Sequence, residues 1–126
     1  MTEFKRFQEV AESCEGYLIE RLSFSRVDES DSLDIGLRWG PNKPDVTLSF
    51  LNVYYFVMGH QPGAGAEPLS EVKTTVLGPS DEPWPEGLAF EDMRSAALPP
   101  LIWLSASGPV QLDVLAAIAT AYVEAR

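Results

Sequence analysis

Residues 46–58 read VTLSFLNVYYFVM, which is the most aromatic run of the chain. From Val46 to Phe50, apolar and polar side chains alternate, a pattern typical of a strand with one buried face. After Asn52 both alternating sets are apolar, from Val53 to Met58. Two structures would explain this change: a central strand covered on both faces, or a bulge near Asn52 that exchanges the two faces.

Strand patterns recur on both sides of this run. The clearest is residues 33–39, LDIGLRW, in which apolar side chains alternate with an aspartate, a glycine and an arginine. Weaker patterns occur at residues 18–24, 72–76 and 101–107. The turn signals DESDS (28–32), GPNKPD (40–45) and Gly108-Pro109 separate these segments.

The C-terminal segment, residues 110–124, fits two structures. Its alanines favour a helix, whereas the alternation from Val110 to Tyr122 favours a strand. The preceding Gly-Pro turn suits a hairpin, so we predict a strand.

One helix is expected at the N-terminus. Residues 4–14 place Phe4, Phe7, Val10 and Ala11 on a single stripe that can pack against another element. Thr2 is the expected N-cap and Gly16 the expected stop.

Residues 78–100 are irregular, with repeated prolines and acids. A loop of this length with its own aromatic side chains is expected to be packed, and residues 88–97 allow a short helix within it.

These patterns predict a single α+β domain over residues 1–126. In it, an N-terminal helix packs on an antiparallel sheet of about five or six strands, with a Pro-rich crossing before the last hairpin. Trp39, Phe56 and Trp103 are predicted to lie in the core. The segment VMGHQPGAGAEP (57–68) is predicted to be a flexible hairpin connection that lets the aromatic strand turn back. It contains no lysine and precedes a strand, which argues against a phosphate-binding loop.

The charge of the chain restricts its partners. Nine Lys and Arg against nineteen Asp and Glu give a net charge of −10, which repels nucleic acids and anionic membranes. The first residues lack an apolar signal-peptide core, and no apolar run approaches the length of about 18 residues that spans a membrane. A cytoplasmic protein is therefore expected.

Few residues are candidates for catalysis or metal binding. Cys14 is the only cysteine and follows the predicted helix, so it is expected to be a small buried apolar group. His60 is the only histidine, which leaves a zinc site without a second histidine ligand. We predict no catalytic residues, no metal and no cofactor. An alternative site is an aromatic pocket for a small molecule or a small enzyme's substrate, formed by Tyr54, Tyr55 and His60.

The acids gather in turns and suit a basic protein partner. Trp84, between two prolines in DEPWPEG, is either a contact residue for that partner or packed back onto the sheet. We predict a main partner-binding site at Asp81, Glu82, Trp84, Glu86, Glu91 and Asp92. A second patch is predicted at Asp28, Glu29 and Asp31.

Two stretches resemble small bacterial immunity-protein-like and YxiG-like domains. They are Phe50-Leu51-Asn52-Val53, and the pattern that runs from Trp103-Leu104 through Gly108-Pro109 to Leu112-Asp113-Val114. The resemblance implies a short, acidic α+β protein that neutralises a toxin, and it brings no catalytic motif. The predicted function is thus a non-enzymatic, immunity-type inhibitor that occludes a basic partner. A homodimer paired through an exposed strand edge is a further expectation.

Overall fold

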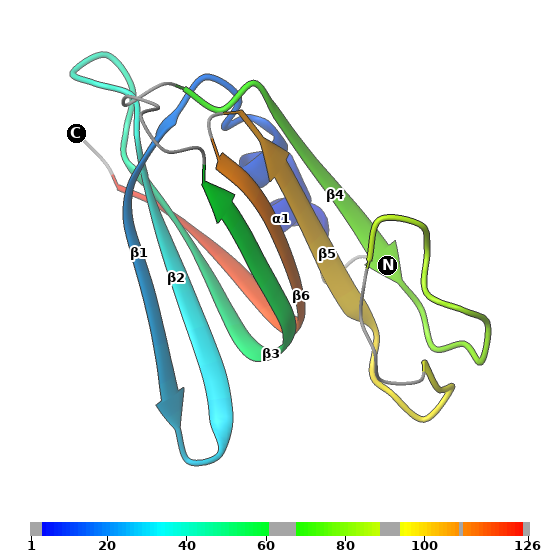
Figure 1. The fold of residues 1–126 in the computed structure, drawn as a ribbon. Coiled ribbons are helices and arrows are strands. Elements are labelled where there is room, and N and C mark those ends of the chain that lie inside the picture. The colour runs from blue at the N-terminus through cyan, green and yellow to red at the C-terminus, as the bar shows by residue number, and fades with distance from the viewer. Residues whose placement is uncertain (1–3, 61–67, 89–93, 109, 125–126) are drawn as a thin grey trace.

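The computed structural model describes residues 4–60, 68–88, 94–108 and 110–124. Within these ranges it contains one helix and six strands, whose arrangement Figure 1 shows. The elements are α1 (Lys5–Glu12), β1 (Leu18–Val27), β2 (Ser30–Arg38), β3 (Val46–His60), β4 (Glu71–Leu77), β5 (Leu101–Ser107) and β6 (Val110–Val123). The strands form one antiparallel sheet in the order β1-β2-β3-β6-β5-β4. The predicted helix and antiparallel sheet are confirmed, although a single helix of 8 residues makes the protein richer in β-structure than α+β implies.

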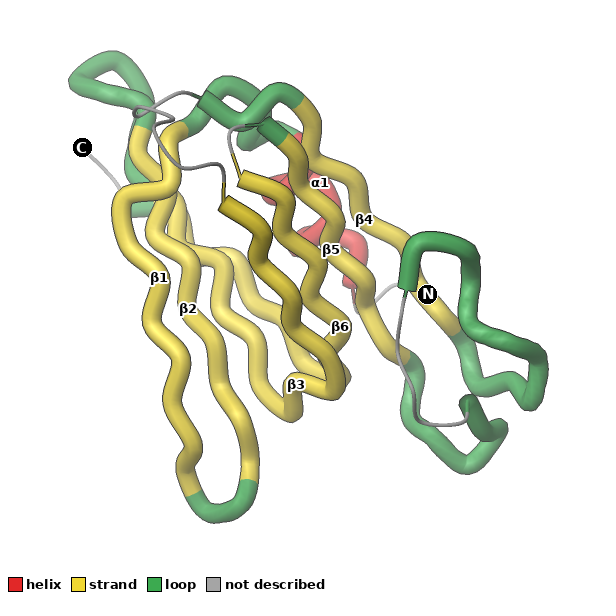
Figure 2. Tube along the Cα trace, viewed as in Figure 1, coloured by secondary structure: helices red, strands yellow, loops and turns green. Residues whose placement is uncertain are grey.

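β3 and β6 are long strands that bend near their middles, so the sheet folds over on itself (Figure 2). At the bend Asn52 has a φ of 55°, and the pairing of β3 with β6 shifts between Val53 and Tyr55. Phe50 before the bend and Val53 after it pack against the same core, whereas residues three positions apart in an unbroken strand would lie on opposite faces. The bulge predicted near Asn52 is therefore confirmed.

The main core is enclosed by the two halves of the folded sheet and by α1. Leu48 from the first half and Leu104 from the second half both face it. Phe7 of α1 packs edge-on against Phe50, with ring centroids 5.4 Å apart. The predicted apolar stripe of the helix is confirmed, because Phe4, Phe7 and Ala11 are buried.

The two ends of α1 fall at other residues than the sequence predicts. α1 ends at Glu12, one turn before the predicted stop at Gly16, and Ser13 is its C-cap. Phe4 occupies the N-cap position, and the expected cap Thr2 lies outside the described residues. Gly16 has a φ of 90° and starts the connection into β1.

A second apolar cluster lies on the other face of the sheet, under the irregular segment 78–100, which is called the Pro-rich loop below. Leu88 of this loop is buried there with Leu77, Leu101 and Leu115. The loop is therefore packed, as predicted. Residues 94–97 are not helical, so the short helix allowed over residues 88–97 is wrong for that part, and residues 89–93 lie outside the described residues.

Residues 61–67 of the predicted hairpin connection lie outside the described residues, but the strands on either side of them do not pair as a hairpin. β3 does not form a hairpin with β4, because β6 occupies the place beside β3 from Val46 to His60. β4 lies at the edge of the sheet and pairs with β5. The predicted strand over residues 110–124 and the last hairpin are confirmed by the pairing of β5 with β6.

The predicted aromatic core is confirmed only in part. Phe56 and Trp103 are half-buried and pack against the two apolar clusters. Trp39 is 40% exposed, which contradicts its predicted place in the core. Its ring lies at the end of β2, 5.5 Å from the ring of Tyr17 and 3.8 Å from the Lys43 ammonium. Trp39 thus covers the solvent side of Gly16 and Tyr17, the residues that lead into β1.

Candidate interaction surface

The β1–β2 turn and the described parts of the loop that follows β4, which carry the predicted acidic patches, lie at the same end of the sheet, where β3 and β6 bend (Figure 1). Strand pairing explains this position. Ser32 of β2 pairs with Leu51 just before the bend, and Ala116 of β6 pairs with both Val53 and Ile102 just after it. These paired residues form the bent end of the sheet. The β1–β2 turn extends past this end on one side, and the loop that follows β4 extends past it on the other side (Figure 1).

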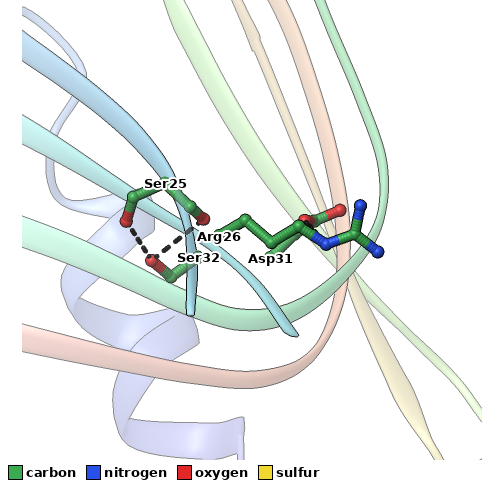
Figure 3. A network of polar contacts seen from close by, with 4 residues as sticks. All are labelled: Ser25, Arg26, Asp31 and Ser32. Atoms are coloured by element: carbon green, nitrogen blue, oxygen red, sulfur yellow. Dashed lines mark hydrogen bonds and ion pairs between the residues drawn. The ribbon is translucent and has the colours of Figure 1, made fainter. Parts of the chain in front are cut away.

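The base of the β1–β2 turn is tied together by polar contacts (Figure 3). The hydroxyl oxygens of Ser25 and Ser32 lie 2.9 Å apart. Next to them, Arg26 Nε lies 3.7 Å from Asp31 Oδ1, in an ion pair that is open to solvent. Of the acids predicted in this patch, Asp31 is therefore already paired within the chain.

The tip of this hairpin is tighter than the sequence suggests. Only Asp28 and Glu29 form the turn, with φ values of 50° and 67°, and Ser30 already belongs to β2. Both acids are exposed, and among the described residues their carboxylates make no hydrogen bond or ion pair. Such a two-residue turn holds both side chains clear of the sheet. The tip thus presents two uncommitted carboxylates.

The Pro-rich loop is closed by one arginine and one aspartate. Arg94 donates hydrogen bonds to the carbonyl oxygens of Gly78, at 3.1 Å, and Pro83, at 3.3 Å. Asp81 Oδ1 accepts a hydrogen bond of 2.9 Å from the Ala96 backbone N–H. Asp81 therefore has a structural task within the loop in addition to any contact with a partner.

Two acids of this loop point to solvent. Glu82 and Glu86 are exposed, and among the described residues neither carboxylate makes a hydrogen bond or ion pair. Glu91 and Asp92, which belong to the same predicted site, lie outside the described residues. The structure thus offers Glu82 and Glu86 as the accessible charges of the main patch.

Trp84 packs back onto the sheet. Its half-buried ring contacts the second apolar cluster, and the Arg94 guanidinium carbon lies 5.6 Å from the ring centroid. Of the two alternatives that the sequence leaves open for Trp84, contact with a partner or packing onto the sheet, the structure shows packing onto the sheet. The exposed part of the ring still lies between Glu82 and Glu86 in the chain.

Tyr54 lies beside the acids of the β1–β2 turn. It lines an open groove of about 220 Å³ with Glu29 and Asp31 of the hairpin. The same side chain packs against the second apolar cluster, which contains Trp84 of the Pro-rich loop. Tyr54 of β3 and Trp84 of the Pro-rich loop therefore pack against the same cluster, although they are about 30 residues apart in sequence.

The alternative pocket at Tyr54, Tyr55 and His60 stays a prediction. Tyr54 and Tyr55 both pack against the second cluster, where Tyr55 pairs with Leu115, and Tyr54 also lines the groove just described. His60 is the last residue of β3, about 17 Å along the strand from Tyr55 at the usual rise per residue. The His60 side chain lies outside what the structure describes.

A polar groove of about 350 Å³, which the sequence did not predict, lies on the outer face of β4, β5 and β6. Trp103, Ser105 and Asp113 line it, beside the ion pair of Lys73 with Glu71, whose atoms are 3.2 Å apart. The signal for it in the sequence is a set of polar side chains at every second position of residues 101–107 and 110–116, which places them on one face of each strand. Strand pairing, which the sequence does not show, brings these positions together.

Among the described residues, the titratable groups with shifted pKa values lie in the interior near α1, away from the β1–β2 turn and the Pro-rich loop. Burial raises the pKa of the Cys14 thiol to about 11. Burial, followed by the charges of Cys14 and Asp45, also raises the pKa of Tyr17, whose hydroxyl donates a 3.2 Å hydrogen bond to the Pro44 carbonyl. Cys14 is fully buried, so the prediction of a small buried group is confirmed.

The described part of the chain holds many acids, one buried cysteine and one short helix. There, no group of three His, Cys, Asp or Glu side chains is arranged to hold a metal ion. Within the same ranges, no helix has the length and apolar character needed to cross a membrane.

Comparison of the chain with protein-family models, with curated proteins and with solved structures found no match.

Proposed function

We propose that the protein is a non-enzymatic binding module whose acidic end covers a basic surface on a partner protein. The acidic end is defined here by Asp28, Glu29, Tyr54, Glu82 and Glu86. The observation that carries this proposal is the position of the two acidic patches, which are remote in sequence but lie at one end of the sheet, with Tyr54 beside the acids of the β1–β2 turn. An aromatic residue surrounded by exposed charge is a common arrangement in protein interfaces.

Electrostatics support a basic partner in particular. The net charge of −10 gives the whole molecule a field that attracts cationic proteins, and the accessible carboxylates focus that field at one end. The hairpin tip and the loop reach past the sheet, so they can enter a cleft on the partner. In its most concrete form the partner is a toxin, and the protein is its immunity-type inhibitor in a bacterial cytoplasm.

The test is capture of partner proteins from an extract of the source cell by the immobilised protein at low salt, with quantification by mass spectrometry. The variant Glu82→Lys/Glu86→Lys reverses two charges at the acidic end. Its matched control, Glu9→Lys/Glu15→Lys, changes the net charge by the same amount at exposed positions in and just after α1. We expect the first variant, and not the control, to lose a partner that the unmodified protein captures.

High salt should also release that partner, because exposed charges separated by more than about 10 Å are screened even at 0.1 M ionic strength. Equal loss of capture in both variants would mean that net charge alone acts. Retention of the partner by Glu82→Lys/Glu86→Lys would show that the acidic end is not the binding surface.

A further inference from the structure

The polar groove on the outer face of β4, β5 and β6 has a rigid aromatic wall. Trp103 donates its indole N–H to Asp113 Oδ1 at 3.1 Å. On the other side of the ring, the backbone of Gly87 approaches so closely that an added Cβ would lie 3.2 Å from Trp103 Cη2. The indole is therefore fixed between a carboxylate and the Pro-rich loop. A ring held in this way loses little conformational freedom when a ligand stacks on it.

The charges in the groove are not balanced along its length. The Lys73 ammonium is already paired with Glu71. Lys73 lies opposite Ser105, which lies opposite Asp113, so two strand spacings, or about 10 Å, separate the backbone positions of the lysine and the aspartate. Among the described residues no Lys or Arg makes an ion pair with Asp113. Asp113 thus supplies an unpaired negative charge at the end of the groove that holds Trp103.

The shape of the groove favours a side chain over a free small molecule. It opens to solvent, whereas small-molecule sites usually bury most of the ligand surface. It is bounded by Gly87, so it adjoins Glu86 of the acidic end. A side chain from a partner seated on that end can therefore reach it.

We propose that this groove receives an arginine side chain of the basic partner. The inference rests on the proposed function and names a contact within it. A planar guanidinium can stack on the Trp103 ring and donate to the Asp113 carboxylate at once, with the Ser105 hydroxyl as a second acceptor. A lysine ammonium lacks the planar fork, so it cannot make both contacts in the same way.

The probe for this contact is N-acetyl-arginine amide, with N-acetyl-lysine amide as the matched cation. Titration of the ¹⁵N-labelled protein is followed by NMR, and the Trp103 indole signal is assigned as the one absent from Trp103→Phe. We expect saturable shifts of this indole signal and of the Asp113 backbone amide with the arginine amide, and much smaller shifts with the lysine amide.

The decisive variant is Asp113→Asn, which keeps an oxygen to accept the indole N–H and removes only the charge. Its affinity for the arginine amide should fall about tenfold, since a charge-assisted hydrogen bond is about twice as strong as a neutral one. Glu124→Gln, an exposed acid at the far end of β6, makes the same charge change and should leave the affinity unchanged.

Three outcomes would overturn the proposal: equal shifts with both amides, shifts confined to residues 28–31, or undiminished affinity in Asp113→Asn. If any of these occurs while Glu82→Lys/Glu86→Lys still loses its partner, the acidic end stands and only the arginine contact fails. If the groove binds arginine but charge reversal at the acidic end has no effect, the proposed function fails instead.

Discussion

At the scale of single residues, Cys14 links burial to the pH dependence of stability. Its thiol is fully buried and its pKa is raised from 9.0 to about 11. A folded-state pKa above the unfolded value means that this contribution to stability is complete below about pH 9 and is lost as the pH rises toward 11. Two pKa units correspond to about 3 kcal/mol at most.

We therefore expect the free energy of unfolding of the unmodified protein to fall between pH 9 and 11 more steeply than that of Cys14→Ala. Urea unfolding monitored by circular dichroism at several pH values measures both slopes. Tyr17 also has a raised pKa, to which the Cys14 charge contributes, so the difference between the slopes reports the thiol together with its coupling to Tyr17. Parallel slopes would show that the thiol is not desolvated.

Trp39 shows where residue-level prediction fails. The alternation of residues 33–39 correctly predicts a strand, and Leu33, Ile35 and Leu37 are buried. The same pattern wrongly extends the buried face to Trp39. The strand ends at Arg38, so the period of two no longer determines where the next side chain points. Cation–π contact with Lys43 then stabilises an exposed ring.

At the scale of elements, α1 covers the open edge of β4. Glu12 Oε2 accepts hydrogen bonds from the Thr74 backbone N–H, at 3.2 Å, and from its hydroxyl, at 2.7 Å. Gln8 Nε2 donates to the same hydroxyl at 3.1 Å. An uncovered edge would offer its backbone groups to another chain. A helix eight residues long thus protects the edge strand as well as closing the core.

Replacement of Glu12 by Ala should expose this edge. The Thr74 amide hydrogen should then exchange with solvent at least about tenfold faster in NMR hydrogen-exchange measurements, because its partner is lost. The Thr75 amide, which in an antiparallel strand points to the opposite side, toward β5, should keep its protection. Glu9→Ala, an exposed position on the same helix, serves as the control. Unchanged exchange at Thr74 would mean that Glu12 does not cap the edge.

Sequence patterns predict the elements of this fold far better than their arrangement. Six strands and the bulge at Asn52 follow from local alternation and its interruption. The neighbours of β3 do not, because β6 comes from the other end of the chain and its pairing is decided by long-range burial. The candidate site divides in the same way: Glu82 and Glu86 are visible as exposed loop acids, whereas the position of Tyr54 beside the β1–β2 turn depends on strand pairing and the bend of the sheet.

At the scale of the whole molecule, the charge of −10 should make salt act in opposite directions on folding and on binding. Repulsion among the acids destabilises the folded chain, and salt screens it, so sodium chloride up to about 0.2 M should raise the midpoint of thermal unfolding. The same screening should weaken capture of a basic partner.

The variant Glu82→Lys/Glu86→Lys should show a smaller effect of salt on its midpoint of thermal unfolding, because it begins with less repulsion. Sucrose stabilises without screening charge, so it should raise the midpoint of both proteins equally. A midpoint that did not rise with salt would show that the acids are too far apart to repel one another, and the acidic end would then lack the concentrated field on which steering of a basic partner depends.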